Sequence, residues 1–268
     1  MGAALGGNEA PGLVFASLTD VGRARKGNED AVGDPRLLAE VVGPPTRLDA
    51  RGTLLAVADG MGGHALGEVA SRLAIEALFS SYYGADGSPP EDLRRAVLAA
   101  NEVVHRANAG RVEAADKHGQ SRMGTTLVAA LIGGSALHVA NVGDSRAYRL
   151  HEGALLPITA DHSLVAEQVR AGMISEADAR TYPYRNVLTR AIGGSSEVEV
   201  DLFSAPWLRG DRLLLCSDGL HGPVPDDLIR RALLELEPED AARALVDAAN
   251  ARGGPDNVTV IVATWSAM

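Results

Sequence analysis

The chain has 268 residues, of which 46% are apolar and 22% are charged, so it can bury the core of a domain and is not globally disordered. Its formal net charge of −10 argues against a nucleic-acid partner, because such partners select basic surfaces. Neither of its two lysines, Lys26 and Lys117, follows a glycine-rich loop, which excludes a P-loop nucleotide site.

Hydrophobic periodicity predicts strands and helices along most of the chain. Residues 1–11 are small and glycine-rich and are expected to form a loose terminus, whereas residues 12–268 contain no repeat or linker and are expected to form one domain. Residues 33–50 hold three prolines and are predicted to be a loop. Strands are predicted at 13–16, 53–58, 211–216 and 258–265, an antiparallel meander at 125–159, and helices at 66–80, 88–107, 161–181, 226–236 and 239–251.

The strands and helices occur in blocks and do not alternate regularly, which favours antiparallel sheets with helices packed outside them. Residues 125–143 carry no formal charge, but Gly133 and Gly134 divide them, so a hairpin is expected there and not a membrane helix. No signal peptide opens the chain, and the single cysteine, Cys216, fits a reducing compartment. We therefore expect a cytoplasmic protein without a membrane partner, with Cys216 as a core thiol.

Four acidic residues stand at strand ends or in glycine-flanked turns. Asp59 follows the apolar run 53–58 and precedes glycines, and Asp30, Asp218 and Asp256 have comparable surroundings. Carboxylate oxygens are the ligands that Mg²⁺ and Mn²⁺ prefer, and two such ions can share one phosphoryl-transfer site. The chain has no paired histidine or cysteine spacing of the kind that binds zinc. The pattern predicts a metal-dependent enzyme, provided that the fold brings these acids together.

At these residues the chain resembles the metal-dependent serine/threonine phosphatases of the protein phosphatase 2C family, in their bacterial form. The resemblance rests on short motifs that follow one another in the family's order over residues 13–265. Each motif is loose by itself, but the ordered series is specific. The motifs lie at 19–30 (TDVGRARKGNED), 57–64 (VADGMGGH), 123–126 (MGTT), 141–146 (NVGDSR), 161–163 (DHS), 188–193 (LTRAIG), 216–220 (CSDGL) and 256–259 (DNVT).

The resemblance implies an α+β fold, an α–β–β–α sandwich of two antiparallel sheets flanked by helices, with two Mn²⁺ or Mg²⁺ ions at one end. Asp59 would bridge the two ions, and the Gly60 carbonyl would hold one of them. Asp218 and Asp256 would hold the other, with Asp30 assisting directly or through water. Asp144 matches the acid of a third, weaker metal site. Arg25 matches the arginine that grips the substrate phosphate in a bidentate fork, and is favoured over Arg23.

Several of these residues have simpler interpretations. Asp218 could start a turn, Asp256 could cap the last strand, and Asp144 could stand at an ordinary hairpin tip. Met61 occupies the position of a histidine that is the proposed general acid in eukaryotic members, with His64 three residues further on. We expect a metal-bound water to donate the proton and His64→Ala to retain most activity. His162 is expected to order a loop, since no pattern places it near the metals.

The resulting interpretation is Mg²⁺- or Mn²⁺-dependent hydrolysis of phosphoserine and phosphothreonine on proteins, in which metal-activated water attacks phosphorus directly. Such an enzyme would reverse a bacterial serine/threonine kinase, act as a monomer and take phosphorylated proteins, including a kinase, as partners. Residues 161–193 match the variable flap of the family and are expected to govern substrate choice. The alternatives are a small-molecule phosphoester hydrolase with the same site and a non-catalytic phosphoprotein-binding module.

Overall fold

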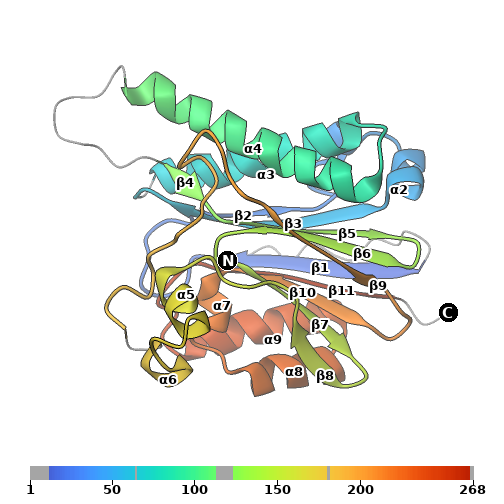
Figure 1. Cartoon of the computed structure of the whole chain (residues 1–268). Coiled ribbons are helices and arrows are strands. Elements are labelled where there is room, and N and C mark those ends of the chain that lie inside the picture. The colour runs from blue at the N-terminus through green and yellow to red at the C-terminus, as the bar shows by residue number, and fades with distance from the viewer. Residues whose placement is uncertain (1–11, 64, 113–122, 180–181, 266–268) are drawn as a thin grey trace.

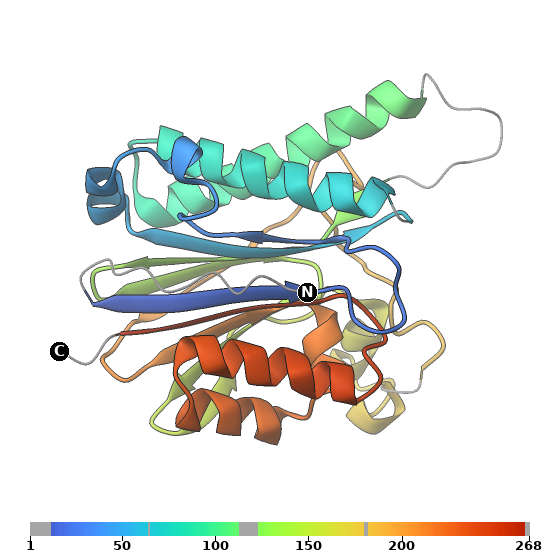
Figure 2. The same cartoon turned by 180° about the vertical axis from the view of Figure 1, so that it is seen from behind.

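The computed structural model describes residues 12–63, 65–112, 123–179 and 182–265. Two antiparallel sheets lie face to face, and helices cover the outer face of each, as Figure 1 and the reverse view in Figure 2 show. The predicted α–β–β–α sandwich is therefore confirmed. The predicted loose terminus, residues 1–11, lies outside the described residues.

One sheet has the strand order β1-β11-β10-β7-β8, and the other has the order β2-β3-β5-β6-β9, with β4 pairing to β3. All the pairs are antiparallel. The strands are β1 (Leu13–Asp20), β2 (Asp30–Gly33), β3 (Thr53–Met61), β4 (Gly124–Thr125), β5 (Leu127–Gly133), β6 (Ala136–Val142), β7 (Arg146–His151), β8 (Ala154–Pro157), β9 (Asp201–Pro206), β10 (Arg212–Cys216) and β11 (Val258–Trp265).

Three apolar layers hold the sandwich together. One lies between the sheets and includes Leu55, Val57 and Ile261. A second lies under α3 (Ala65–Gly84) and α4 (Pro89–Val112), and a third under α8 (Asp226–Glu235) and α9 (Pro238–Ala251). The central strands are buried on both faces, which explains why their sequences are mostly apolar and do not alternate between apolar and polar residues.

The remaining helices are short, and they include the main departures from the predicted elements. The proline-containing segment 33–50 is not simply a loop, because it contains α1 (Ala39–Val42) and most of α2 (Pro45–Arg51). The helix expected over 161–181 is split into α5 (Leu164–Arg170) and α6 (Glu176–Ala179), with Gly172 at a φ of 70° between them. A further turn of helix, α7 (Asp218–His221), follows β10 directly. Among the described residues, no helix is long and apolar enough to span a membrane.

The expected meander at 125–159 is wrong in one respect that matters for the site. β5 and β6 belong to one sheet, whereas β7 and β8 belong to the other. The chain changes sheets at Gly143, whose φ of 108° is left-handed and whose position leaves no room for a side chain, since a Cβ there would lie 2.6 Å from Thr126 Cβ. A short loop excludes a parallel crossover, but it permits a step between facing sheets. This step carries Asp144 to the gap between them.

Candidate functional site

Asp30 and Asp59 meet across neighbouring strands. They are directly opposite each other in the β2–β3 pairing, and the Gly60 N–H donates a hydrogen bond to the Glu29 carbonyl at 3.1 Å. The backbone of Asp59 is fixed from the other side by Thr126, whose Oγ1 accepts from the Asp59 N–H at 3.0 Å and whose own N–H donates to the Asp59 carbonyl at 2.9 Å. The two carboxylates therefore stand side by side on a rigid sheet.

Gly60 is required by close backbone packing. A Cβ at this position would lie 2.2 Å from the carbonyl oxygen of Gly67 in α3 and 2.5 Å from that of Glu29. Gly67 is equally constrained, because a Cβ on it would meet the Glu29 carboxylate. The glycines after Asp59 thus allow the first turns of α3 to press against the end of β3.

A second close approach brings Asp218 and Asp256 to the same end of the sandwich. A Cβ on Gly219 would lie 1.9 Å from the Asn257 carbonyl oxygen, so α7 packs directly on the residues that precede β11. Ser217 joins this pair to Asp30: its Oγ donates to Asp30 Oδ2 at 2.8 Å and accepts from the Thr259 N–H at 3.0 Å. The four acids identified from the sequence are therefore neighbours in the fold.

Arg25 lies on the loop between β1 and β2, and its Nη2 donates to Asp256 Oδ2 at 2.6 Å. The loop is tied to the β11 end by Asn257, which belongs to the motif at 256–259 and for which the sequence predicted no role of its own. Its Nδ2 donates to the Val21 and Gly27 carbonyls, both at 2.9 Å, and its Oδ1 accepts from the Glu29 N–H at 2.8 Å. Asn is the residue type that offers a donor and an acceptor on one short side chain, and its place after Asp256 was the available signal.

The acids at this end repel one another. Burial raises the pKa of Asp30 to about 7, and the charges of Asp218 and Asp256 add to the effect. Burial, together with neighbouring acids, also raises the pKa of Asp144 to about 7 and that of Asp218 to about 6, and holds the pKa of Asp59 well above its ordinary value. Two carboxylate oxygens, Asp30 Oδ1 and Asp218 Oδ1, are buried without a hydrogen-bond partner.

This arrangement fits a site for hard cations. It offers oxygen donors, a surplus of negative charge and two carboxylate oxygens that lack a partner. Within the described residues, however, no three acidic, histidine or cysteine side chains converge on one point. Binding an ion at this end therefore requires these side chains to draw closer together.

The comparisons with known proteins decide the family. Residues 45–254 match the family model described as protein phosphatase 2C. The chain belongs to the protein phosphatase 2C family.

Curated relatives of this phosphatase family include the serine/threonine protein phosphatase PstP of Mycobacterium tuberculosis, 42% identical over 94% of this chain, and the serine/threonine phosphatase stp of Listeria monocytogenes, 39% identical over 91% of it. The chain spans 45% of the length of the first and 92% of the second. Among solved structures, the catalytic domain of PstP in complex with two manganese ions is 39% identical, with a TM-score of 0.78, over 96% of this chain and 99% of that one.

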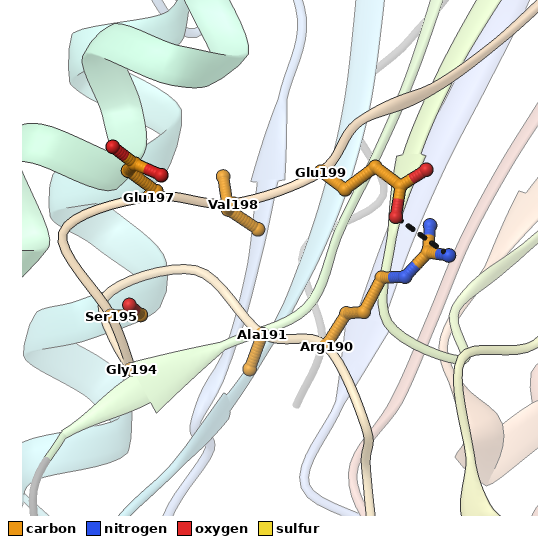
Figure 3. A pocket seen from close by; sticks show the side chains of 7 residues that line it. All are labelled: Arg190, Ala191, Gly194, Ser195, Glu197, Val198 and Glu199. Atoms are coloured by element: carbon orange, nitrogen blue, oxygen red, sulfur yellow. Dashed lines mark ion pairs between the residues drawn. The ribbon is translucent and has the colours of Figure 1, made fainter.

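Residues 161–193, which the sequence leads us to expect as a flap, begin beside the acids and end at a shallow pocket. The pocket has a volume of about 250 Å³, and Figure 3 shows Arg190 and Glu199 paired at its edge. Thr125, which donates its Oγ1 hydrogen to the Asp59 carbonyl at 2.8 Å, is bridged to Ile192 on this segment. The pocket lining comprises Arg190, Ala191, Gly194, Ser195, Glu197, Val198 and Glu199.

Two other sequence expectations concern proton donors and loops. Met61 closes β3, which continues three residues beyond the predicted strand 53–58, and His64 lies outside the described residues. His162 does order a loop, because it is 2% exposed and hydrogen-bonded to Gly143. Its neighbour Asp161 pairs with Arg146 at 2.7 Å. His162 therefore contacts Gly143, the residue that directly precedes Asp144. No sequence pattern had indicated this contact.

Proposed function

We propose that this chain is an Mn²⁺- or Mg²⁺-dependent phosphatase that hydrolyses phosphoserine and phosphothreonine on proteins. The observation that carries the proposal is the group of partly or fully buried carboxylates at one end of the sandwich, whose pKa values are raised and two of whose oxygens lack a partner. Such a group is costly unless a cation neutralises it. The relative PstP has been crystallised with two manganese ions, which supports this cofactor.

We assign the acidic residues to the cations as follows. Asp59 would hold both ions, the Gly60 carbonyl would hold one of them, and Asp218 and Asp256 would hold the other. Asp30 would assist the second ion directly or through water. Asp144 would serve a third, weaker site. When bound, the ions would supply the positive charge that polarises water and the phosphoryl oxygens.

The residues around the ions would bind and orient the phosphate. Arg25 is half-exposed and donates to Asp256, so its fork can reach a phosphate at the mouth of the site while remaining anchored. Asn257 holds the backbone of the loop that carries Arg25, which limits the loss of conformational entropy on binding. These two residues would set the orientation of the phosphoryl group relative to the acids.

Transfer of the phosphoryl group directly to water agrees with the chemistry of the only cysteine. Cys216 is fully buried in β10, and burial raises the pKa of its thiol to about 12. A thiol in that environment is a poor nucleophile, since the thiolate is the reactive form. The ester oxygen of the serine or threonine would leave as the phosphorus–water bond forms, and no phosphoenzyme would accumulate.

The partners we infer are phosphorylated proteins, including a serine/threonine kinase whose action the chain would reverse. We infer a cytoplasmic, monomeric phosphatase from the acidic surface and the single buried thiol. The flap segment, residues 161–193, exposes Met173 and Tyr184 by 75% and 60%, which suits contact with a protein substrate. Exchange of this segment with that of a relative should change the ranking of phosphoprotein substrates.

Phosphate release from a phosphothreonine peptide tests the proposal. We expect release with Mn²⁺, none with excess chelator, and a collapse of the rate in Asp218→Asn. Free phosphothreonine should be a much poorer substrate than the peptide. Equal turnover of the two would favour a small-molecule phosphoester hydrolase. Binding of the peptide without release, with any divalent metal, would favour a regulatory binding module.

A further inference from the structure

The turn that carries Asp144 is gripped by a histidine at the start of the flap segment. The N–H of His162 donates to the Gly143 carbonyl at 3.0 Å, and the Gly143 N–H donates back to the His162 ring at Nδ1, at 3.1 Å. One residue thus satisfies both backbone groups of Gly143. Because Gly143 is held in a left-handed conformation, this contact fixes the direction in which the following residue points.

The orientation of the His162 ring is set in turn by Asp201 of β9. Since Nδ1 accepts from Gly143, the ring hydrogen of the neutral imidazole lies on Nε2, which donates to Asp201 Oδ2 at 3.2 Å. The other carboxylate oxygen of Asp201 accepts from Arg190 at 2.8 Å. Both nitrogens of the His162 ring are therefore engaged, and the ring is 2% exposed. It can act on the site only through the turn.

A second histidine also contacts the backbone of this turn. His221 Nε2 lies 3.0 Å from the carbonyl oxygen of Asp144, and because a carbonyl only accepts, the ring nitrogen donates. His221 ends α7, the short helix that begins with Asp218, so it stands three residues along on the same face of the helix. The backbone of Asp144 is consequently fastened to the helix that carries another proposed metal ligand.

We propose that His162 and His221 are positioning residues that fix the Gly143–Asp144 turn and thereby set the affinity of the third cation, the one that Asp144 would bind. The inference rests on the proposed metal-dependent function. His162 links the Asp144 turn to the base of the flap, and His221 links it to Asp218. Removing a residue that orients a metal ligand in this way commonly lowers the metal affinity by about 10- to 100-fold.

A titration of the intact chain with Mn²⁺, followed by the electron paramagnetic resonance of the free ion, measures the bound ions without using activity. We expect two tight ions and a third, weaker one that disappears in Asp144→Ala. His221→Leu should lower the affinity of the third, weaker Mn²⁺ site about tenfold. The affinities of the two tight sites should stay within about twofold of the wild-type values. His221→Gln places an amide N–H near the position of Nε2, and should restore the third class to within about threefold of the wild type.

The corresponding pair at the other histidine is His162→Asn and His162→Leu. The asparagine keeps an acceptor near the position of Nδ1 and should retain more of the third class than leucine does. Melting temperatures show whether each variant folds. If His162→Leu does not fold, the His221 pair decides by itself.

Three results would overturn the inference. The first is a Mn²⁺ affinity of the third site that changes by less than twofold in His221→Leu. The second is an equal weakening of all classes, which would indicate general destabilisation. The third is a wild-type isotherm with tight ions but no class that depends on Asp144. Failure of the proposed function is distinguishable from all three, because the chain would then bind no Mn²⁺ tightly.

Discussion

The buried and partly buried aspartates of this chain form two groups. Away from the proposed site, Asp34, Asp92 and Asp211 are at most 1% exposed, and each is paired with an arginine at 2.5–3.0 Å. At the site, Asp30, Asp59, Asp144 and Asp218 form no ion pair with an arginine, lysine or histidine of the described residues. Within the described residues, each of the three structural aspartates has an arginine as its counter-charge, whereas among the acids of the site only Asp256 has one, Arg25.

The pKa values follow the same division. Burial alone would raise the pKa of Asp34 and Asp92, but hydrogen bonds from Arg36 and Arg51 outweigh it and leave both values below the ordinary one. At the site, burial acts in the same direction and nearby acids reinforce it. The difference indicates that the missing positive charge comes from outside the chain.

Asp59→Asn should have the largest effect on activity. Removing the proposed bridging carboxylate should lower peptide turnover by about 10³-fold or more, because both cations would lose a ligand. The melting temperature of the metal-free variant should be unchanged or higher, since a repelling charge is gone. Asp49→Asn, at an exposed position on α2, is the control and should change neither quantity. Retained turnover in Asp59→Asn would break the distinction between the two groups.

The same substitution in the paired group should do the opposite. Asp92→Asn leaves Arg51 buried without its counter-charge and should lower the free energy of unfolding by about 3–5 kcal/mol. Turnover per folded molecule, measured well below the melting temperature, should stay within about threefold of the wild type. Chemical denaturation measures the first quantity and peptide turnover the second. A stable but inactive variant would contradict the interpretation of this pair as structural.

Arg25→Ala sharpens the comparison, because Arg25 is the one arginine of the described residues that forms an ion pair with an acid of the site. Loss of its fork should lower kcat/KM for the peptide by about 10- to 100-fold, mainly through KM, while Mn²⁺ affinity is retained. Arg23→Ala, whose partner Asp20 is 3.9 Å away, should change kcat/KM by less than about threefold. If Arg23→Ala has the larger effect, the phosphate contact is assigned to the wrong arginine.

The stability of the metal-free protein should fall as the pH rises from about 4 to 7. In that window the folded state holds protons on Asp30, Asp144 and Asp218, whose pKa values are about 7, 7 and 6, whereas the unfolded state has lost them. In chelator, the melting temperature at pH 5.5 should therefore exceed that at pH 8, by about 2–4 °C for each kcal/mol. Saturating Mn²⁺ should stabilise more at pH 8 than at pH 5.5. A steeper loss of stability towards acid would contradict this.

His64→Ala should have the smallest effect, with turnover within about threefold of the wild type. The prediction comes from the sequence, where Met61 replaces the histidine of eukaryotic members and His64 stands three residues further on. The pH profile of kcat gives a second readout, because loss of a general acid would alter its basic limb. A loss comparable to that in Asp59→Asn would make His64 the proton donor.

Much of the fold could be predicted from the sequence because its signals are local. The apolar stripe of α3, the Ser-Pro-Pro-Glu signal at the start of α4 and the mostly apolar β11 were each recognisable without tertiary information. The short strand β9 was missed, because all six of its residues are only partly buried or exposed and its pattern is weak. The change of sheet at Gly143 was missed because a strand that is buried on both faces has the same apolar sequence pattern in either sheet.

The site was predictable in its residue types but not in its contacts. Asp59 and Asp218 could be identified from the glycines that follow them, and the structure shows that Gly60 and Gly219 are required by contacts with Gly67 and Asn257. The pairings themselves join residues that are far apart in the sequence. His162 and His221 could not be recognised, because each acts on the backbone of another segment.

The position of β11 has a consequence for the order in which the molecule can be assembled. The last strand of the described chain lies inside its sheet, between β1 and β10, and Leu13 faces Trp265 across the β1–β11 pair. While the ribosome still holds the C-terminal residues, β1 lacks its partner strand β11. Asp256, which lies just before β11, is then also absent from the end of the sandwich that carries Asp30. A nascent chain of this protein should therefore stay catalytically silent until synthesis of the domain is complete.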